Sequence, residues 1–292
     1  MRYSLIGLIS ALFAAILWAL ASILYKNSGE VEHPIKLNFL KGIIALFLLT
    51  VTALINKTDF LILRNDFLLL ALSGLIGIGI GDTAYFYALK LIGAQQTLLI
   101  ATLAPGVTII LGGIFLNEIL TIQTFFSLLI SIVGIILVIT AGENNKNLHS
   151  IRGYIWSLLA MSSQAIGILL SRLTMRTSAI PALSSAMVRL FFGVIFLFIL
   201  ILIQKRNIFK YKFESKNLFL TFLIAVFFGT FITMWLQQNA LKFLEAGIAQ
   251  TLLSTSPIFI AIFHIISGKK VKPQTILGIL LSLIGVFVLF LL

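Results

Sequence analysis

The residue best suited to chemistry is an aspartate inside an apolar stretch of the chain. Asp82 follows Gly79, Ile80 and Gly81, and Tyr85 lies one turn further on. An ionised aspartate at the centre of a bilayer costs about 2.5–3.5 kcal/mol even on insertion scales, so such a group usually faces a cavity or a partner. Burial favours the neutral carboxyl group, and reversible protonation would make Asp82 a proton-coupling residue. The competing interpretation is a hydrogen-bonded aspartate that only fixes helix packing.

The same run matches the Gly-x-Gly-Asp motif of intramembrane aspartyl proteases. That chemistry needs two carboxyl groups that share a proton. The other aspartates, Asp59 and Asp66, fall in or beside a predicted loop, and no glutamate lies in the middle of an apolar segment. The catalytic pair cannot be assembled, so the sequence argues against a protease and against an enzyme in general.

Other catalytic and cofactor-binding patterns are missing from the sequence. It contains no cysteine, no phosphate-binding loop with a Walker lysine, no zinc-ligating helix motif and no nucleophile elbow. His264 has no second ligand beside it, so no metal site is predicted. We therefore expect no cofactor and no ATP-driven pumping.

Polar and aromatic side chains at helical spacing predict a ligand cavity instead. Trp18 and Ser22, for example, are four residues apart and share one face of a helix. The alternative is that such residues hold helices together or lie in interfacial belts. The predicted cavity residues are Trp18, Tyr85, Thr102, Gln164, Arg189, Trp235, Gln238 and Ser254.

Two prolines and two basic residues complete the candidates. Pro105 and Pro257 are predicted to interrupt and bend their helices, with or without contact to a ligand. Lys41 is expected to extend its ammonium group to the membrane surface. Arg189 lies deeper in its helix and is the better candidate to bind a substrate carboxylate.

The elements that position these residues are membrane spans. The chain has 292 residues, of which 60% are hydrophobic and 10% charged, which excludes a soluble globular protein. The net charge of +12 is assigned to loops and headgroup contacts rather than to nucleic-acid binding. One membrane domain, residues 1–292, is predicted. Its ten helical spans are 5–25, 36–55, 67–89, 94–116, 122–141, 152–172, 181–204, 218–241, 246–267 and 273–292.

The two halves of the chain repeat each other. Lys90 and Lys242 both follow Ala-Leu, and a proline comes 15 residues after each, at Pro105 and Pro257. Residues 1–145 and 146–292 therefore each hold five spans, with Lys41 opposite Arg189 and Asp82 opposite Met234. Because five is odd, the second half is predicted to be inverted in the membrane, as in many secondary transporters. The cavity is expected between spans 1, 3, 4, 6, 8 and 9.

The sequence resembles the EamA-type drug/metabolite transporter superfamily. The resemblance lies in the Gly-Asp…Tyr-Phe-Tyr-Ala-Leu-Lys…Pro pattern of residues 81–105, in Asn117-Glu118 and in the five-plus-five repeat. The resemblance implies a ten-helix carrier with a central cavity that moves small metabolites such as amino acids, usually outward. It also implies cytoplasmic termini, whereas the excess of Lys and Arg in the loops on the opposite side favours external ones. The second half departs from the pattern, with Lys269 where the first has Glu118.

These observations lead to a functional hypothesis. We expect a secondary transporter that exports small amphipathic metabolites, amino acids or related compounds, by alternating access. Its expected partners are the substrate, the lipid bilayer of the cell membrane and coupling protons, with no nucleic acid, and we expect a monomer. A lipid flippase of the same fold is the alternative.

Overall fold

The computed structural model describes residues 4–29, 33–59, 63–141, 150–205, 215–268 and 270–291. All regular secondary structure in these ranges is helical. Within them, ten helical segments are long and apolar enough to cross a membrane, which confirms the predicted all-helical fold. The spans are Leu5–Tyr25, Pro34–Ile55, Arg64–Gly93, Gln96–Leu116, Ile122–Ala141, Ile151–Thr177, Ala182–Ile203, Lys216–Phe243, Ala246–Ile266 and Pro273–Leu291.

Several spans are interrupted, so they comprise more than one helix. The helices of the first half are α1 (Leu5–Gly29), α2 (Pro34–Ile55), α3 (Arg64–Gly74), α4 (Thr83–Ala101), α5 (Ala104–Leu116) and α6 (Ile122–Ala141). Those of the second half are α7 (Ile151–Thr177), α8 (Ala182–Ile203), α9 (Lys216–Val226), α10 (Thr233–Phe243), α11 (Ala246–Leu253), α12 (Ser256–Ile266) and α13 (Pro273–Leu291). Within α4, Gly93 has a φ of 74°, and this residue separates the third span from the fourth.

The third span of each half contains a π-helical segment. The two segments, Leu75–Asp82 and Phe227–Ile232, begin at positions separated by the same 152 residues as Lys90 and Lys242. π-Helical turns are rare and occur frequently at functional sites, because the extra residue in each turn shifts the side chains around the helix axis. Asp82 is the last residue of the first segment.

The fourth span of each half is broken just before its proline. α4 ends at Ala101 and α5 begins at Ala104, while α11 ends at Leu253 and α12 begins at Ser256. Pro105 and Pro257 each lie in the first turn of the helix after the break, where a proline has no backbone hydrogen bond to lose. Thr102 and Thr255 each donate a side-chain hydrogen bond to a carbonyl three residues earlier.

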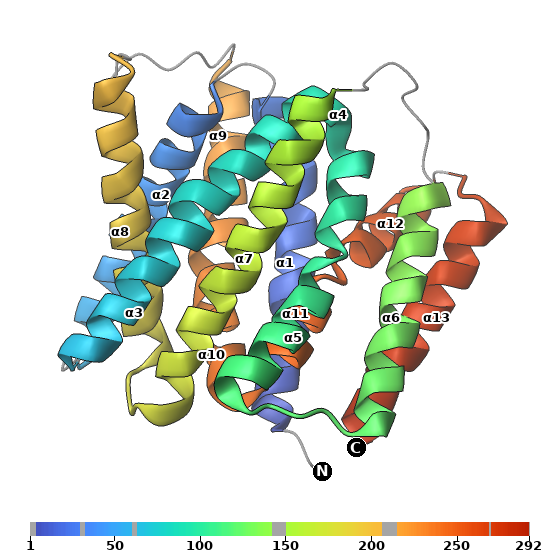
Figure 1. Ribbon diagram of the computed structural model, residues 1–292. Helices are drawn as coiled ribbons and strands as arrows, with labels where there is room; N and C mark the ends of the chain where they lie inside the picture. Colours follow the sequence, from blue (N-terminus) through green and yellow to red (C-terminus); the bar gives the residue numbers. More distant parts are fainter. Residues whose placement is uncertain are drawn as a thin grey trace.

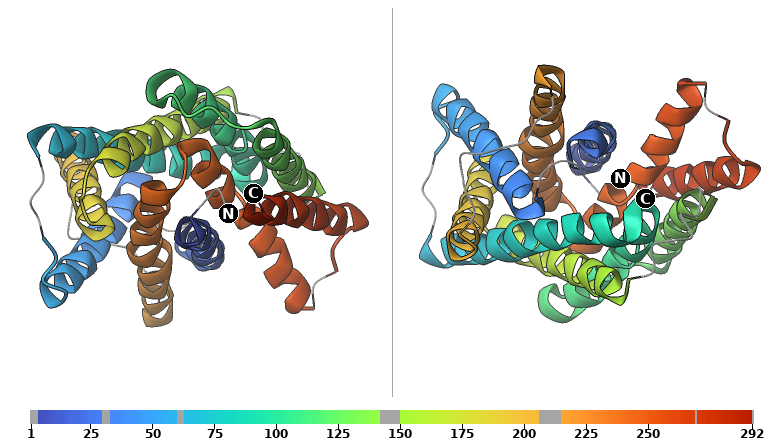
Figure 2. Two further views of the ribbon diagram at one scale, coloured as in Figure 1. Left: turned by 90° about the horizontal axis from the view of Figure 1, so that it is seen from below. Right: turned by 90° about the horizontal axis from the view of Figure 1, so that it is seen from above.

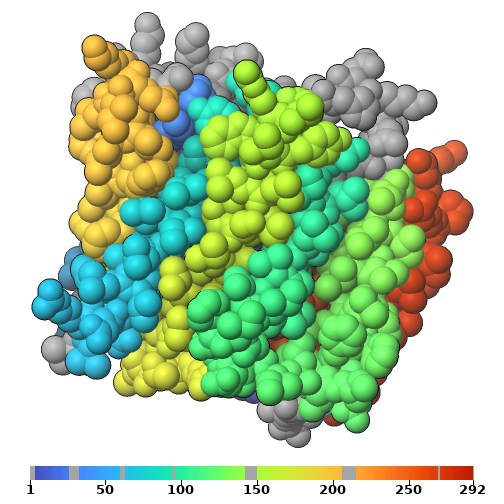
Figure 3. Space-filling view, viewed as in Figure 1, coloured from blue at the N-terminus to red at the C-terminus, as the bar shows by residue number. Residues whose placement is uncertain are grey.

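The helices form a single bundle whose two termini lie at the same end (Figure 1). Seen along the bundle, α2, α3 and α8 lie at one edge, α6 and α13 at the other, and α1 between them (Figure 2). On the face shown in Figure 3, α3, α7, α5 and α6 lie side by side across the surface. α1 starts at the end that carries the termini, whereas α7 starts at the opposite end (Figure 1).

Candidate functional site

The candidate site is a central cavity of about 190 Å³ lined by both halves of the chain. Six of the predicted cavity residues line it, together with Asp82 and Pro257. Those six are Trp18, Tyr85, Thr102, Gln164, Arg189 and Ser254. Lys41 also brings span 2, which was not expected there, to the cavity wall, and the predicted residue Arg189 brings span 7.

Two predicted cavity residues are placed elsewhere. Met234 and Gln237 of α10 face the cavity, and Trp235 is turned about 100° from Met234 around the helix, where it packs on the apolar cluster that includes Phe222. Gln238 is completely buried outside the cavity lining, and its Oε1 accepts hydrogen bonds from Ser171 at 2.7 Å and Ser185 at 2.8 Å. Gln238 therefore joins α7, α8 and α10. Pro105 is likewise buried outside the lining.

Asp82 forms an ion pair, which the sequence did not predict. Lys41 Nζ lies 2.6 Å from Asp82 Oδ2, and the Lys41 side chain is 2% exposed. The prediction that Lys41 reaches the membrane surface is therefore wrong: a nearby carboxylate attracts the ammonium group inward. Its Nζ also lies 5.1 Å from the Phe86 ring centroid and 5.9 Å from that of Trp18, distances at which cation–π attraction acts.

Arg189 is the second buried cation of the cavity. It comes from the helix of the second half that corresponds to α2, and it is 1% exposed. Its Nη1 donates to Gln237 Oε1 over 3.5 Å, at the outer limit of a hydrogen bond, and its Nε has no partner. Two cations and one acid thus line the cavity.

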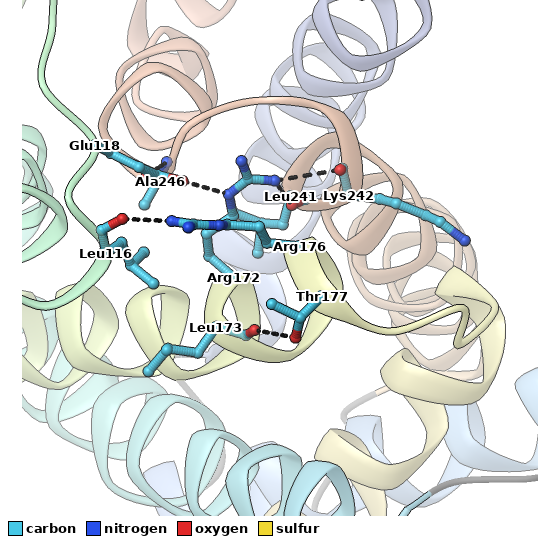
Figure 4. Close-up of polar contacts among 9 residues, drawn as sticks. All are labelled: Leu116, Glu118, Arg172, Leu173, Arg176, Thr177, Leu241, Lys242 and Ala246. Atoms are coloured by element: carbon cyan, nitrogen blue, oxygen red, sulfur yellow. Dashed lines mark hydrogen bonds and ion pairs between the residues drawn. The ribbon is translucent and has the colours of Figure 1, made fainter.

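A second polar network lies where α5 and α7 end, at the end of the bundle that carries the termini (Figure 1), and Figure 4 shows its contacts. Arg172 Nε donates to Glu118 Oε1 over 2.7 Å, and Arg172 Nη1 donates to the carbonyls of Leu241 and Lys242. Glu118 Oε2 accepts from the backbone N–H of Ala246 at 2.8 Å, at the first turn of α11. The network therefore links the ends of α5, α7 and α10 to the start of α11.

Local structure explains why Glu118 reaches this network. Asn117 closes α5 in the left-handed conformation, with a φ of 52°, and so turns the chain towards α7. Arg172 and Arg176 lie four residues apart on one face of α7, and Arg176 donates to the carbonyl of Leu116. Sequence reasoning noted Asn117-Glu118 but gave the pair no role. The only available signal was two arginines at helical spacing in the other half.

The contacts of Gln238 and the network around Arg172 both lie on the terminal side of the cavity. The residues of α7 that line the cavity lie between Ser157 and Gln164. Further towards the terminal end of α7 come Ser171, which donates to Gln238, and its neighbour Arg172, which pairs with Glu118. These buried polar contacts thus lie between the part of α7 that lines the cavity and the end that carries the termini.

The structure offers no metal centre within its described residues, because no three His, Asp or Glu side chains cluster there. The lining combines an ion pair, a second cation, amides, hydroxyls and aromatic rings. Such a surface can hold a small polar molecule reversibly by hydrogen bonds and charge.

Comparison with known proteins gives consistent results. The model of the EamA-like transporter family matches twice, over residues 5–140 and 151–291. A protein of Archaeoglobus fulgidus named "Uncharacterized transporter" is 25% identical over 295 residues, covering 98% of this chain and 99% of the relative. A solved structure, described only as the crystal structure of a protein, superposes with a TM-score of 0.80 at 16% identity and covers 98% of this chain and 96% of its own, which shows a shared fold.

Proposed function

Because the chain belongs to the EamA-like transporter family, we propose that this multi-pass membrane transporter exports small amphipathic metabolites, amino acids or related compounds, by alternating access. The observation that carries the proposal is the central cavity, which holds a partly buried ion pair and is lined by both halves. Its volume of about 190 Å³ suits a small metabolite better than a lipid, since pockets for drug-sized ligands measure roughly 300–1,000 Å³. We place the protein in the cell membrane, as a monomer.

The proposed mechanism treats the two halves as inverted repeats that rock against each other. In support, α1 and α7 cross the bundle in opposite directions (Figure 1). The π-helical segments and the helix breaks before Pro105 and Pro257 also occur at corresponding places in both halves. Broken helices around a central site are typical of secondary transporters with this design.

Proton coupling through Asp82 is part of the same proposal. In this proposal Asp82 would take up a proton that enters from the outer solution and release it on the inner side, and the neutral carboxyl group would no longer hold Lys41 at 2.6 Å by its charge. Breaking this pair changes the contacts between α2 and the π-helical segment. Substrate and proton would then cross in opposite directions.

Counterflow in proteoliposomes tests the transport activity. Vesicles with purified protein, loaded with one unlabelled amino acid, are exposed to the same amino acid in labelled form, across a panel of amino acids. We expect rapid uptake of at least one label in the presence of the protein and none in empty vesicles. Absence of counterflow for the whole panel would contradict amino-acid transport.

A matched pair of variants ties the activity to the cavity. Ala160 lines the cavity, whereas its neighbour Leu158 is 46% exposed on the outer surface of α7. Ala160→Phe adds a ring inside the cavity and should reduce counterflow at least about tenfold by excluding substrate. Leu158→Phe adds a ring outside and should leave counterflow at the parent rate. Equal rates for both variants would mean that the substrate passes elsewhere.

A further inference from the structure

The charges that line the cavity do not balance. Lys41 and Arg189 are cations, and Asp82 is the only acid among the described lining residues. Lys41 is paired with Asp82, so the positive charge of Arg189 is left over. A buried charge without a counter-ion is strongly unfavourable, and buried arginines are normally paired.

Arg172 is a buried arginine with a structural role, and its hydrogen bonds can be compared with those of Arg189. Its Nε pairs with Glu118, and its Nη1 donates to the carbonyls of Leu241 and Lys242. Arg189 is more deeply buried, yet it has only the 3.5 Å contact to Gln237, and its Nε is unpartnered. Arg189 therefore lines the cavity with a hydrogen-bonding capacity that the protein leaves partly unused.

The internal repeat shows what is missing beside Arg189. Lys41 and Arg189 come from corresponding helices of the two halves, α2 and α8. In the first half the third span supplies Asp82 to pair with the cation, while the position 152 residues later is Met234, which also lines the cavity. The second half therefore has the cation, Arg189, but no acid at the position that corresponds to Asp82.

We propose that Arg189 is the binding site for a substrate carboxylate, which takes the place beside Arg189 that Asp82 fills beside Lys41. This inference rests on the proposed transport function and specifies its substrate class. The carboxylate belongs to a small monocarboxylic acid or to an amino acid, with an apolar or aromatic body beside Trp18 and Tyr85. The planar guanidinium group matches a carboxylate with two parallel hydrogen bonds.

Binding to the purified protein tests this without requiring transport. The midpoint of thermal unfolding in detergent is measured with 3-phenylpropanoate, its uncharged amide 3-phenylpropanamide, phenethylamine, L-phenylalanine and inorganic phosphate. Ligands that bind the folded protein raise the midpoint in proportion to the logarithm of their concentration. We expect an increase of at least about 3 °C with 3-phenylpropanoate, L-phenylalanine or both, and none with the amide or the amine.

The pattern of responses distinguishes the sources of the carboxylate. A response to 3-phenylpropanoate alone assigns a simple carboxylic acid, and a response to L-phenylalanine assigns an amino acid. A response to phosphate with none to either carboxylate would overturn the proposal in favour of a phosphorylated ligand. Equal responses to the acid, the amide and the amine would also overturn it, because the charge would then not matter.

An isosteric variant supplies the missing acid inside the protein. Gln237 Oε1 lies 3.5 Å from Arg189 Nη1, so Gln237→Glu places a carboxylate beside the guanidinium with little change in shape. We expect a higher midpoint without ligand, together with an affinity for the responding carboxylate that is at least about 100-fold weaker. Gln250→Glu, the matched control, adds the same charge to the cavity wall from α11 without a contact to Arg189.

Comparison of the two variants separates pairing at Arg189 from the overall charge of the cavity. The loss of affinity should be at least about tenfold larger for Gln237→Glu than for Gln250→Glu, and equal losses would overturn the assignment to Arg189. Arg189→Lys keeps the charge but not the two parallel donors, and should weaken the carboxylate by at least about tenfold while the protein still folds. Unchanged binding in Arg189→Lys would count against the proposal.

Carboxylate binding at Arg189 and the proposed transport function can fail independently of each other. Carboxylate binding without counterflow of the same compound would leave the site assigned but contradict alternating access. Counterflow of amines or uncharged amides without any carboxylate binding would support transport and overturn the role of Arg189.

Discussion

The pair of Lys41 and Asp82 is the residue-level feature with the clearest energetic consequence. Removing two charges from water is costly, and the 2.6 Å contact, together with the Phe86 and Trp18 rings near Lys41 Nζ, offsets that cost. Loss of one partner leaves the other charge in the cavity wall without compensation. Each member of the pair therefore contributes to stability, whatever its role in transport.

Asp82→Asn tests proton coupling. The change keeps the size of the side chain but removes its charge and its titration, so we expect loss of substrate accumulation driven by a pH gradient while counterflow continues. We also expect a loss of stability of up to about 3 kcal/mol, because Lys41 loses its counter-ion and the Asp82 side chain is only 24% exposed. The measurements are uptake into vesicles with an imposed pH gradient and thermal unfolding.

Asp66→Asn is the matched control, because Asp66 lies in the first turn of α3 and outside the cavity lining. It should retain accumulation driven by the pH gradient, with a loss of stability below about 1 kcal/mol from the weaker helix-dipole interaction. If Asp82→Asn accumulates substrate against a pH gradient as the parent does, the residue is structural and the protein is a facilitator.

At the level of elements, the contact between α6 and α13 depends on small residues from both halves. A Cβ at Gly278 would lie 2.7 Å from the carbonyl oxygen of Gly134, and one at Gly285 would lie 2.3 Å from Ser131 Oγ. Backbones this close gain van der Waals packing, the main attraction between helices in a membrane. These two helices therefore form a tightly packed unit at one edge of the bundle (Figure 2).

Gly278→Ala measures the contribution of the contact between α6 and α13 to the stability of the protein. The added methyl group meets backbone atoms of Gly134 and Val138, which cannot rotate away, so the helices must separate at a cost of about 1–3 kcal/mol. Gly106→Ala in α5 is the control, since a Cβ there meets no atom within 4 Å, and it should gain up to about 1 kcal/mol from helix propensity. Thermal unfolding in detergent should separate the two variants, and equal midpoints would refute the packing argument.

At the level of the whole molecule, contacts that span both halves lie at the end of the bundle that carries the termini. Glu118 from the first half binds Arg172 and the start of α11 from the second (Figure 4). If the halves rock as proposed, this network must open in the alternate state. Its strength then sets the balance between the two states, since a population shift follows the difference in their contacts.

Glu118→Gln should shift that balance. The change removes the ion pair with Arg172 while keeping the shape of the side chain, so the closed state loses stability relative to the state open at the terminal end. The sequence contains no cysteine, which allows single introduced thiols to report access. We expect a water-soluble maleimide to label Ser171→Cys at least about fivefold faster when Glu118→Gln is also present.

Ser282→Cys provides the control for this measurement, because Ser282 is fully buried in α13 and faces α6 rather than the network. Its labelling rate should be the same with Glu118 and with Glu118→Gln. Faster labelling at both positions would show general loosening of the fold, and no change at Ser171→Cys would contradict a gating role for Glu118.

The sequence by itself determined the ten spans and several residues that line the cavity. Hydropathy is local, so the spans follow from runs of apolar residues, and the repeated Ala-Leu-Lys and proline spacing places corresponding segments in both halves. Polar residues in such segments avoid lipid, which is why Trp18, Tyr85 and Gln164 could be assigned to the cavity from their positions alone.

Only the tertiary structure decided which polar groups meet. Lys41 turns inward because Asp82, on a neighbouring span, forms an ion pair with it. Gln238 is a structural link rather than a cavity residue because the hydroxyl groups of Ser171 and Ser185 donate to its side chain. Glu118 pairs with Arg172, which lies 54 residues later in the sequence. Helical periodicity fixes the face of a side chain on its own helix but not the rotation of neighbouring helices about one another, and that rotation decides whether a buried charge has a partner.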